Sequence, residues 1–147
     1  MPLGTKGTVL LHCDKMKKNS LVIISNERTF KQNNNFSEAY NNLANTQKKI
    51  NENENAIYNY LQATKADKSN LEAYFNLANL YRSEKKYEEA INNYQKVLEL
   101  RPQFVEALNN IGTIQLILGN FENGLKYFKK TIEIDKFYSE SYFNYVS

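Results

Sequence analysis

The stretch from Leu71 to Phe104 reads LEAYFNLANLYRSEKKYEEAINNYQKVLELRPQF. It matches the chain again when it is shifted by its own length in either direction. The upstream copy is SEAYNNLANTQKKINENENAIYNYLQATKADKSN over residues 37–70, and the downstream copy is VEALNNIGTIQLILGNFENGLKYFKKTIEIDKFY over residues 105–138. A further copy begins in residues 139–147. Self-similarity at a fixed period is the mark of a repeat architecture, so residues 37–147 are predicted to form an array of three repeats and the start of a fourth.

Each repeat carries the hydrophobic pattern of two helices. In the central copy, Tyr74, Leu77, Ala78 and Tyr81 follow the i, i+3, i+4, i+7 spacing that gathers side chains on one helix face. The same spacing recurs in a second segment, at Ala90, Ile91, Tyr94, Val97 and Leu98. The link between them, residues 83–86, is short and polar, so the two helices are expected to run antiparallel as a hairpin. The predicted fold class is therefore all-α.

Small and large residues recur at fixed places in these helices. The small ones let another helix approach closely, and they are Ala44, Ala78 and Gly112 on the first helices and Ala56, Ala90 and Gly124 on the second. Large side chains beside them, Tyr60, Tyr94 and Phe128 on the second helices, are predicted to fill the core. Arg101-Pro102 should end one second helix, because proline disfavours helical backbone in the residue before it. Gly119 should end a first helix, since glycine often follows a helix C-terminus.

Residues 1–36 do not follow the repeat and are predicted to be an irregular or degenerate capping segment. One interpretation is a degenerate helix from about Ser20 to Gln32 that covers the open end of the array. The alternative is disorder, which the run Asn33-Asn34-Asn35 also allows.

Charge and composition exclude several classes of function. The chain carries a formal charge of +3, which divides into +4 for residues 1–36 (six basic, two acidic) and −1 for residues 37–147 (13 basic, 14 acidic). The array therefore lacks the basic stripe that nucleic-acid binding requires. Single residues of histidine and cysteine, His12 and Cys13, fall short of a metal site, so neither a metal nor another cofactor is expected. No run of apolar residues approaches the roughly 20 that span a bilayer, and the expectation is a cytoplasmic protein without a membrane partner.

The chain resembles the tetratricopeptide repeat family. The resemblance is carried by the period of about 34 residues and by Tyr74, Leu77, Ala78, Tyr81, Tyr87, Ala90, Tyr94 and Pro102. It covers residues 37–147 and implies an α-solenoid, a superhelix of stacked hairpins whose first helices line a concave groove. Members of this family bind peptide segments of partner proteins in that groove. Lys68 and Lys136 stand where the family pattern has proline, and the first repeat is expected to be the loosest.

The resemblance places a set of polar residues in the groove. They are Asn42, Asn45, Lys49, Asn76, Asn79, Arg82, Asn109, Asn110 and Asn144. Among them an asparagine recurs at one position of every repeat, at Asn42, Asn76, Asn110 and Asn144. An amide offers both a donor and an acceptor, so such a ladder could pair with the backbone of an extended peptide. The other interpretation is that these amides bond a neighbouring helix, and the sequence leaves both open.

The function predicted from these features is a protein–protein interaction module that binds a peptide of its partner. No nucleophile elbow, metal cluster or phosphate loop is present, so the chain is not expected to be an enzyme. The alternative is the N-terminal substrate-recruiting fragment of a larger transferase, similar to O-GlcNAc transferase or a sulfotransferase. Solenoid ends usually need a polar cap, and the incomplete repeat that begins at Ser139 does not provide one. A further prediction is therefore self-association through the uncapped C-terminal end.

Overall fold

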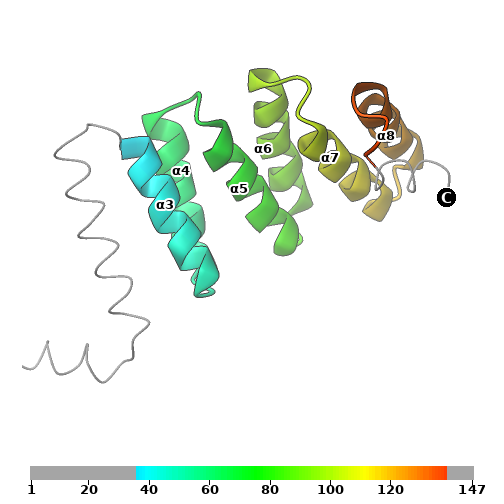
Figure 1. The fold of residues 1–147 in the computed structure, drawn as a ribbon. Helices are drawn as coiled ribbons and strands as arrows, with labels where there is room; N and C mark the ends of the chain where they lie inside the picture. The colour runs from blue at the N-terminus through cyan, green and yellow to red at the C-terminus, as the bar shows by residue number, and fades with distance from the viewer. Residues whose placement is uncertain (1–35, 139–147) are drawn as a thin grey trace, which may run out of the picture. The chain divides into compact units, whose positions relative to one another are not determined.

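The structure is a computed structural model, and it describes residues 36–138. Every regular element in this part of the chain is an α-helix, which confirms the predicted all-α class. The helices are α3 (Phe36–Lys49), α4 (Asn53–Ala66), α5 (Leu71–Ser83), α6 (Tyr87–Leu100), α7 (Val105–Ile117) and α8 (Phe121–Ile134) (Figure 1). The predicted capping segment and the start of a fourth repeat lie outside the described residues.

The chain divides into two compact units, Met1–Ala73 and Tyr74–Ser147. The described part of the first unit is the hairpin of α3 and α4 with the beginning of α5. The second unit contains the remainder of α5 and the helices α6, α7 and α8. The boundary therefore falls within the first turn of α5, next to the link between the first two repeats.

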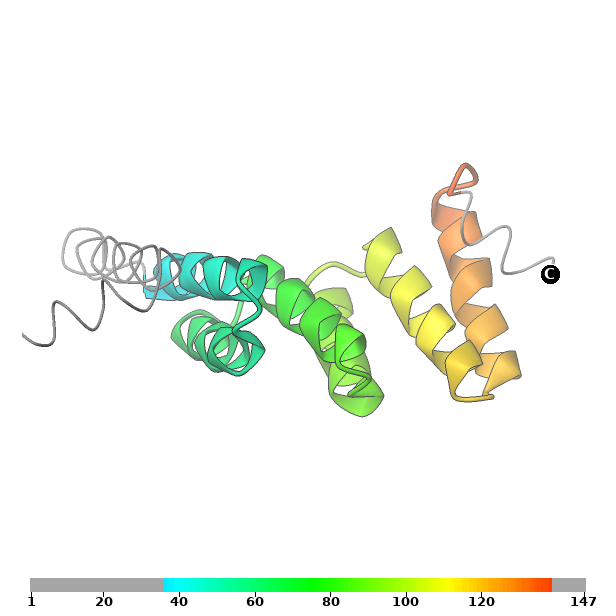
Figure 2. The same ribbon diagram turned by 90° about the horizontal axis from the view of Figure 1, so that it is seen from below.

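In the first unit, α3 and α4 lie side by side as a hairpin in both views (Figures 1 and 2). The small residues Ala44 and Ala56 are completely buried, and so is the large ring of Tyr60. The end of this hairpin is tied to its start, because Ser37 Oγ donates to the carbonyl of Ala63 at 2.9 Å. Asn70 Nδ2 in turn donates to Ser37 Oγ at 2.7 Å. The core predicted from the repeat pattern is thus present, with hydrogen bonds closing one end.

The second unit repeats this arrangement in the α5–α6 and α7–α8 pairs. Ala78 and Ala90 are fully buried beside Tyr94. In α7 and α8 the two small positions are glycines, Gly112 and Gly124, and both are buried. A Cβ atom built on Gly112 would lie 2.7 Å from the ring of Phe128, so α7 and α8 approach more closely here than an alanine permits. The recurrence of small residues therefore does mark close helix packing.

The turns inside the three hairpins share one backbone conformation. Asn51, Lys85 and Gly119, which occupy the same position in successive repeats, all have positive φ values, of 61°, 60° and 79°. In each turn the following residue closes a six-residue loop, as when the Asn120 N–H donates to the Gln115 carbonyl at 2.8 Å. This is the Schellman arrangement, in which a left-handed residue ends the helix and satisfies its last carbonyls. The sequence predicted it only at Gly119, because glycine is its recognisable signal.

The links between repeats are stabilised differently, in two cases by the side chain of an aspartate. The Asp67 carboxylate accepts hydrogen bonds from the Ser69 N–H at 2.8 Å and from Ser69 Oγ at 2.6 Å. These bonds hold the pKa of Asp67 below its usual value. Asp135 closes the corresponding link by accepting from the Phe137 N–H at 2.9 Å. At the third such place α6 ends at Leu100, immediately before Arg101-Pro102 as predicted.

None of the helices within residues 36–138 is long and apolar enough to cross a membrane.

Candidate interaction surface

A chain of hydrogen bonds joins three helices in the second unit. The hydroxyl of Tyr94 on α6 donates to Asn79 Oδ1 on α5 at 2.5 Å. Asn110 Nδ2 on α7 donates to the Tyr94 oxygen at 3.1 Å and, more weakly, to Asn79 Oδ1 at 3.4 Å. Arg82 Nη1, at the end of α5, donates to Asn110 Oδ1 at 2.5 Å. Tyr94 is buried, the two amides are half-buried and Arg82 is exposed, so this series of hydrogen bonds extends from the core to solvent. We call these four residues the Arg82 network.

The first unit contains the corresponding pair. The hydroxyl of Tyr60 on α4 donates to Asn45 Oδ1 on α3 at 2.6 Å. Burial raises the pKa of Tyr60 to about 12, and the Glu72 carboxylate adds to the shift. Burial likewise raises the pKa of Tyr94 to about 12, although Arg82 and the hydrogen bond from Asn110 oppose the shift. Both hydroxyls are therefore protonated at neutral pH and act as donors to an asparagine oxygen.

The third repeat lacks this pair at both positions. Thr113 stands where Asn45 and Asn79 do, and Phe128 stands where the two tyrosines do. The Thr113 hydroxyl instead donates to the carbonyl of Asn109 in its own helix at 3.0 Å. A buried tyrosine hydroxyl needs a partner, and so the tyrosine and its asparagine are present or absent as a pair.

An aromatic cluster lies beside the Arg82 network. The ring of Phe75 on α5 is 5.9 Å from that of Tyr94 and 5.0 Å from that of Phe104, in both cases tilted. The guanidinium of Arg101 lies 5.6 Å from the centre of the Phe104 ring. Because Phe75 and Phe104 remain half-buried, the polar network has a partly accessible apolar neighbour.

The predicted groove residues differ in accessibility. Asn42 and Lys49 are exposed, as is Arg82, and Asn45, Asn76, Asn79 and Asn110 are half-buried. Asn109 is only 1% exposed, so its placement in an accessible groove does not hold in this structure. It occupies the same repeat position as Asn41, which is also buried and donates to Glu72 Oε1 at 3.0 Å. At this position the amide faces protein. Asn144 lies outside the described residues.

The two interpretations of the asparagine ladder can be compared at Asn110. Its oxygen and its nitrogen both bond residues of neighbouring helices. The amide of Asn110 is therefore engaged within the protein, as the second interpretation has it. Contact between the ladder and a peptide stays a prediction.

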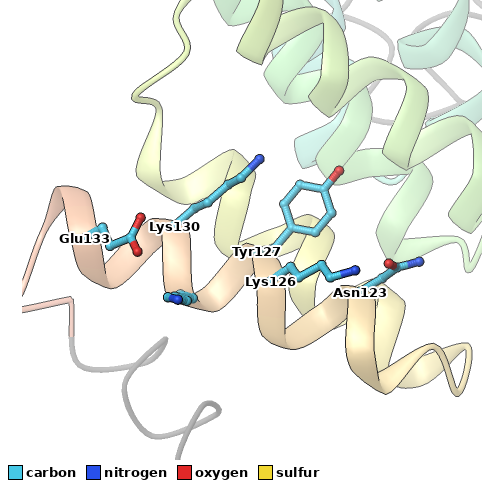
Figure 3. Close-up of a pocket in the computed structure, with 6 residues that line it drawn as sticks. Asn123, Lys126, Tyr127, Lys130 and Glu133 are labelled. Atoms are coloured by element: carbon cyan, nitrogen blue, oxygen red, sulfur yellow. The ribbon is translucent and has the colours of Figure 1, made fainter.

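A hollow of about 450 Å³ lies along α8, away from the predicted site. It is lined by Asn123, Lys126, Tyr127, Lys129, Lys130 and Glu133 (Figure 3). The Lys130 ammonium lies 5.8 Å from the centre of the Tyr127 ring, and Lys126 pairs with Glu122 at 3.0 Å. None of the predicted groove residues lines this hollow. No group of three or more metal-ligating side chains occurs within residues 36–138.

The repeat pattern predicted Tyr60 and Tyr94 as core residues and did not predict their polar role. A signal for it was available. Each tyrosine follows an asparagine at a separation of 15 residues, and the third repeat has neither member of the pair.

Two-helix units that recur at a fixed period define a helical repeat protein. Sequence profiles support a specific assignment. One profile described as "TPR repeat" matches residues 78–119, and two described as "Tetratricopeptide repeat" match residues 59–92 and residues 37–70 and 105–138. Together they cover residues 37–138, and the chain belongs to the tetratricopeptide repeat family.

Solved structures of similar fold agree with this assignment. The crystal structure of MamA is 28% identical with a TM-score of 0.71, and the match covers 78% of this chain and 67% of that one. YrrB, described as a TPR protein with an unusual peptide-binding site, is 25% identical with a TM-score of 0.70, covering 82% of this chain and 62% of YrrB. The first TPR domain of Spaghetti (RPAP3), bound to an HSP90 peptide, is 20% identical with a TM-score of 0.69, covering 75% and 87%. No curated protein matches the sequence.

Proposed function

We propose that this chain is a protein-interaction module that binds an extended peptide segment on the faces of its first helices. The observation that carries the proposal is the Arg82 network, in which an exposed cation and half-buried amides lie beside a partly accessible aromatic cluster. Peptide sites combine an apolar anchor with a few fixed polar groups. In the second unit, Phe75 supplies the anchor and Asn79 and Arg82 supply the polar groups.

Two further observations favour a peptide over other ligands. YrrB, with a similar fold, is described as having a peptide-binding site. The repeat region is also nearly neutral, at −1 for residues 37–147 (13 basic, 14 acidic). Affinity for nucleic acid depends chiefly on neutralised phosphates, and a nearly neutral surface does not provide it.

A peptide-display selection against the full chain tests the proposal. The enriched peptides are synthesised and their affinities measured by fluorescence anisotropy. Arg82→Ala should weaken binding about tenfold or more, because a hydrogen bond to a charged group contributes roughly 1.5–3 kcal/mol. The matched control is Lys126→Ala, which removes another exposed cation, from the hollow on α8. If Lys126→Ala abolishes binding and Arg82→Ala does not, the α8 hollow is the site and the proposal is wrong.

A further inference from the structure

We infer that Arg82 fixes the direction of every hydrogen bond in its network, so that Asn79 presents its NH2 group outward and the surface offers a ligand donors rather than acceptors. This inference deepens the proposed function and rests on it for the identity of the ligand.

The first step is the contact between Arg82 and Asn110. A guanidinium carries five N–H donors and no acceptor. The atom of Asn110 that lies 2.5 Å from Arg82 Nη1 must therefore be the amide oxygen. With the oxygen held there, the NH2 group of Asn110 is directed to the other side, toward α5 and α6.

The second step passes through Tyr94. Its oxygen lies 3.1 Å from Asn110 Nδ2 and accepts a hydrogen bond from it. The hydroxyl has one proton, and this proton is directed to Asn79 at 2.5 Å. The facing atom of Asn79 must then be an acceptor, so it is Oδ1. Burial keeps the hydroxyl protonated, in agreement with the raised pKa of Tyr94.

The third step concerns the remaining group of Asn79. Its oxygen accepts from both Tyr94 and Asn110, which uses its two lone pairs. Its Nδ2 has no hydrogen-bond partner within residues 36–138. Because Asn79 is half-buried rather than enclosed, these two N–H donors remain available to a ligand.

The chemistry of the ligand follows. A free amide side chain pairs with either the N–H or the C=O of a peptide, because it can turn over. If Asn79 turned over, the proton of the Tyr94 hydroxyl would lose its acceptor, and the NH2 group of Asn79 would face that of Asn110. At this point the surface selects carbonyl or carboxylate oxygens, and Tyr94 and Arg82 are positioning residues for that selection. The third repeat, with Thr113 and Phe128, lacks the same device.

The direction of the network can be measured without any ligand. In the full chain labelled with ¹⁵N, the side-chain NH2 signal of Asn110 should be protected from exchange with water and that of Asn79 should exchange freely. In Arg82→Lys, which also offers only donors, the pattern should stay the same. In Arg82→Glu the carboxylate attracts the NH2 of Asn110, every bond reverses, and Asn79 should become the protected amide. Identical exchange patterns in the wild type and Arg82→Glu would overturn the role of Arg82.

The selectivity is measured on the peptide obtained by selection. Each backbone position is changed in turn to a thioamide, which weakens the acceptor, or to an N-methyl amide, which removes the donor. We expect one thioamide position to lose about 3- to 10-fold in affinity, the range of a single neutral hydrogen bond, and N-methylation of the residue whose carbonyl is affected to change binding less than about twofold. In Tyr94→Phe the thioamide sensitivity should decrease, while the control Tyr127→Phe should keep it. Sensitivity to N-methylation alone would contradict the inference. If no peptide binds at all, the proposed function fails, and the exchange experiment still decides the direction of the network.

Discussion

The hydroxyl of Tyr94 lies 2.5 Å from the amide oxygen of Asn79, and the pair recurs one repeat earlier as Tyr60 and Asn45 at 2.6 Å. In each case a second helix places its largest buried side chain so that the hydroxyl bonds an asparagine of the first helix. The ring contributes to the core and the hydroxyl orients a polar group near the surface. Packing and the candidate site are thus coupled through a single atom.

This coupling predicts the alkaline behaviour of the protein. Burial raises the pKa of both tyrosines from the ordinary 10.0 to about 12. A group whose pKa is raised by folding contributes stability that is complete below its unfolded value and is lost as the pH rises through the folded value. We therefore expect stability to fall between about pH 10 and pH 12, with the tyrosinate absorbance steps of Tyr60 and Tyr94 at the upper end of the same interval.

The absorbance of tyrosinate during a rapid pH titration measures this directly. Tyr60→Phe and Tyr94→Phe should each remove one of the high-pH steps, and the control Tyr58→Phe, at an exposed position, should remove neither. Phe128 shows that phenylalanine fits the same position of the repeat, so both variants should fold. A titration in which neither variant changes the final steps would mean that these hydroxyls are not the buried ones.

The hydrophobic pattern predicted the helices well because their burial recurs from one repeat to the next. Ala44, Ala78 and Ala90 are fully buried as expected, and α6 ends before Pro102. The polar network could not be derived in the same way. The direction of a hydrogen bond depends on which side chains of neighbouring helices face one another, and on their positions to within a few tenths of an ångström. The hydrophobic pattern does not determine these positions. Asn109 shows the limit: its neighbour Asn110 is half-buried, whereas Asn109 itself faces protein.

The hairpin turns make a second prediction. Lys85 adopts a φ of 60°, which costs a residue with a Cβ atom roughly 1–2 kcal/mol and costs glycine little. Lys85→Gly should therefore stabilise the protein by about 0.5–1 kcal/mol, after the added flexibility of the unfolded chain is subtracted. Urea unfolding followed by circular dichroism measures the change.

Gly119→Ala provides the reverse test at the same position of the next repeat. Its φ is 79° and a Cβ atom there would meet nothing within 4 Å, so the only effect is backbone strain. We expect a loss of about 1 kcal/mol. An increase in stability for Gly119→Ala would mean that this turn can change its backbone conformation freely.

The link at Asp67 predicts sensitivity to acid. Its carboxylate is stabilised as the anion by the Ser69 hydroxyl and N–H, which lower its pKa. A lowered pKa contributes stability that is present above the ordinary value of 3.8 and is lost as the pH falls through the folded value. Asp67→Asn should therefore reduce the melting temperature at neutral pH and make it less dependent on pH below about 4. Thermal melts across this range provide the measurement, and Lys68→Gln in the same turn should melt as the wild type does.

The close approach of α7 and α8 gives the last prediction. A Cβ atom on Gly112 would lie 2.7 Å and 2.9 Å from two atoms of the Phe128 ring, which is planar and fully buried. Gly112→Ala should therefore destabilise the protein by about 1–3 kcal/mol, the usual cost of overpacking. A Cβ atom on Gly124 would lie 2.8 Å from the flexible end of Leu116 and 3.1 Å from the backbone oxygen of Gly112. Gly124→Ala should cost less, because the nearest neighbour can move and the backbone contact is less tight. Chemical denaturation compares the two variants.

A triple variant tests whether the asparagine–tyrosine pair, and not the glycine, sets the distance between the two helices of a hairpin. The earlier repeats place alanine at the position of Gly112, but they combine it with the asparagine–tyrosine pair. The change Gly112→Ala, Thr113→Asn and Phe128→Tyr transfers that set to the third repeat, and it should recover part of the stability lost in Gly112→Ala alone. If the triple variant is less stable than Gly112→Ala, the pair does not set the helix spacing, and the glycines are required by the α7–α8 hairpin itself.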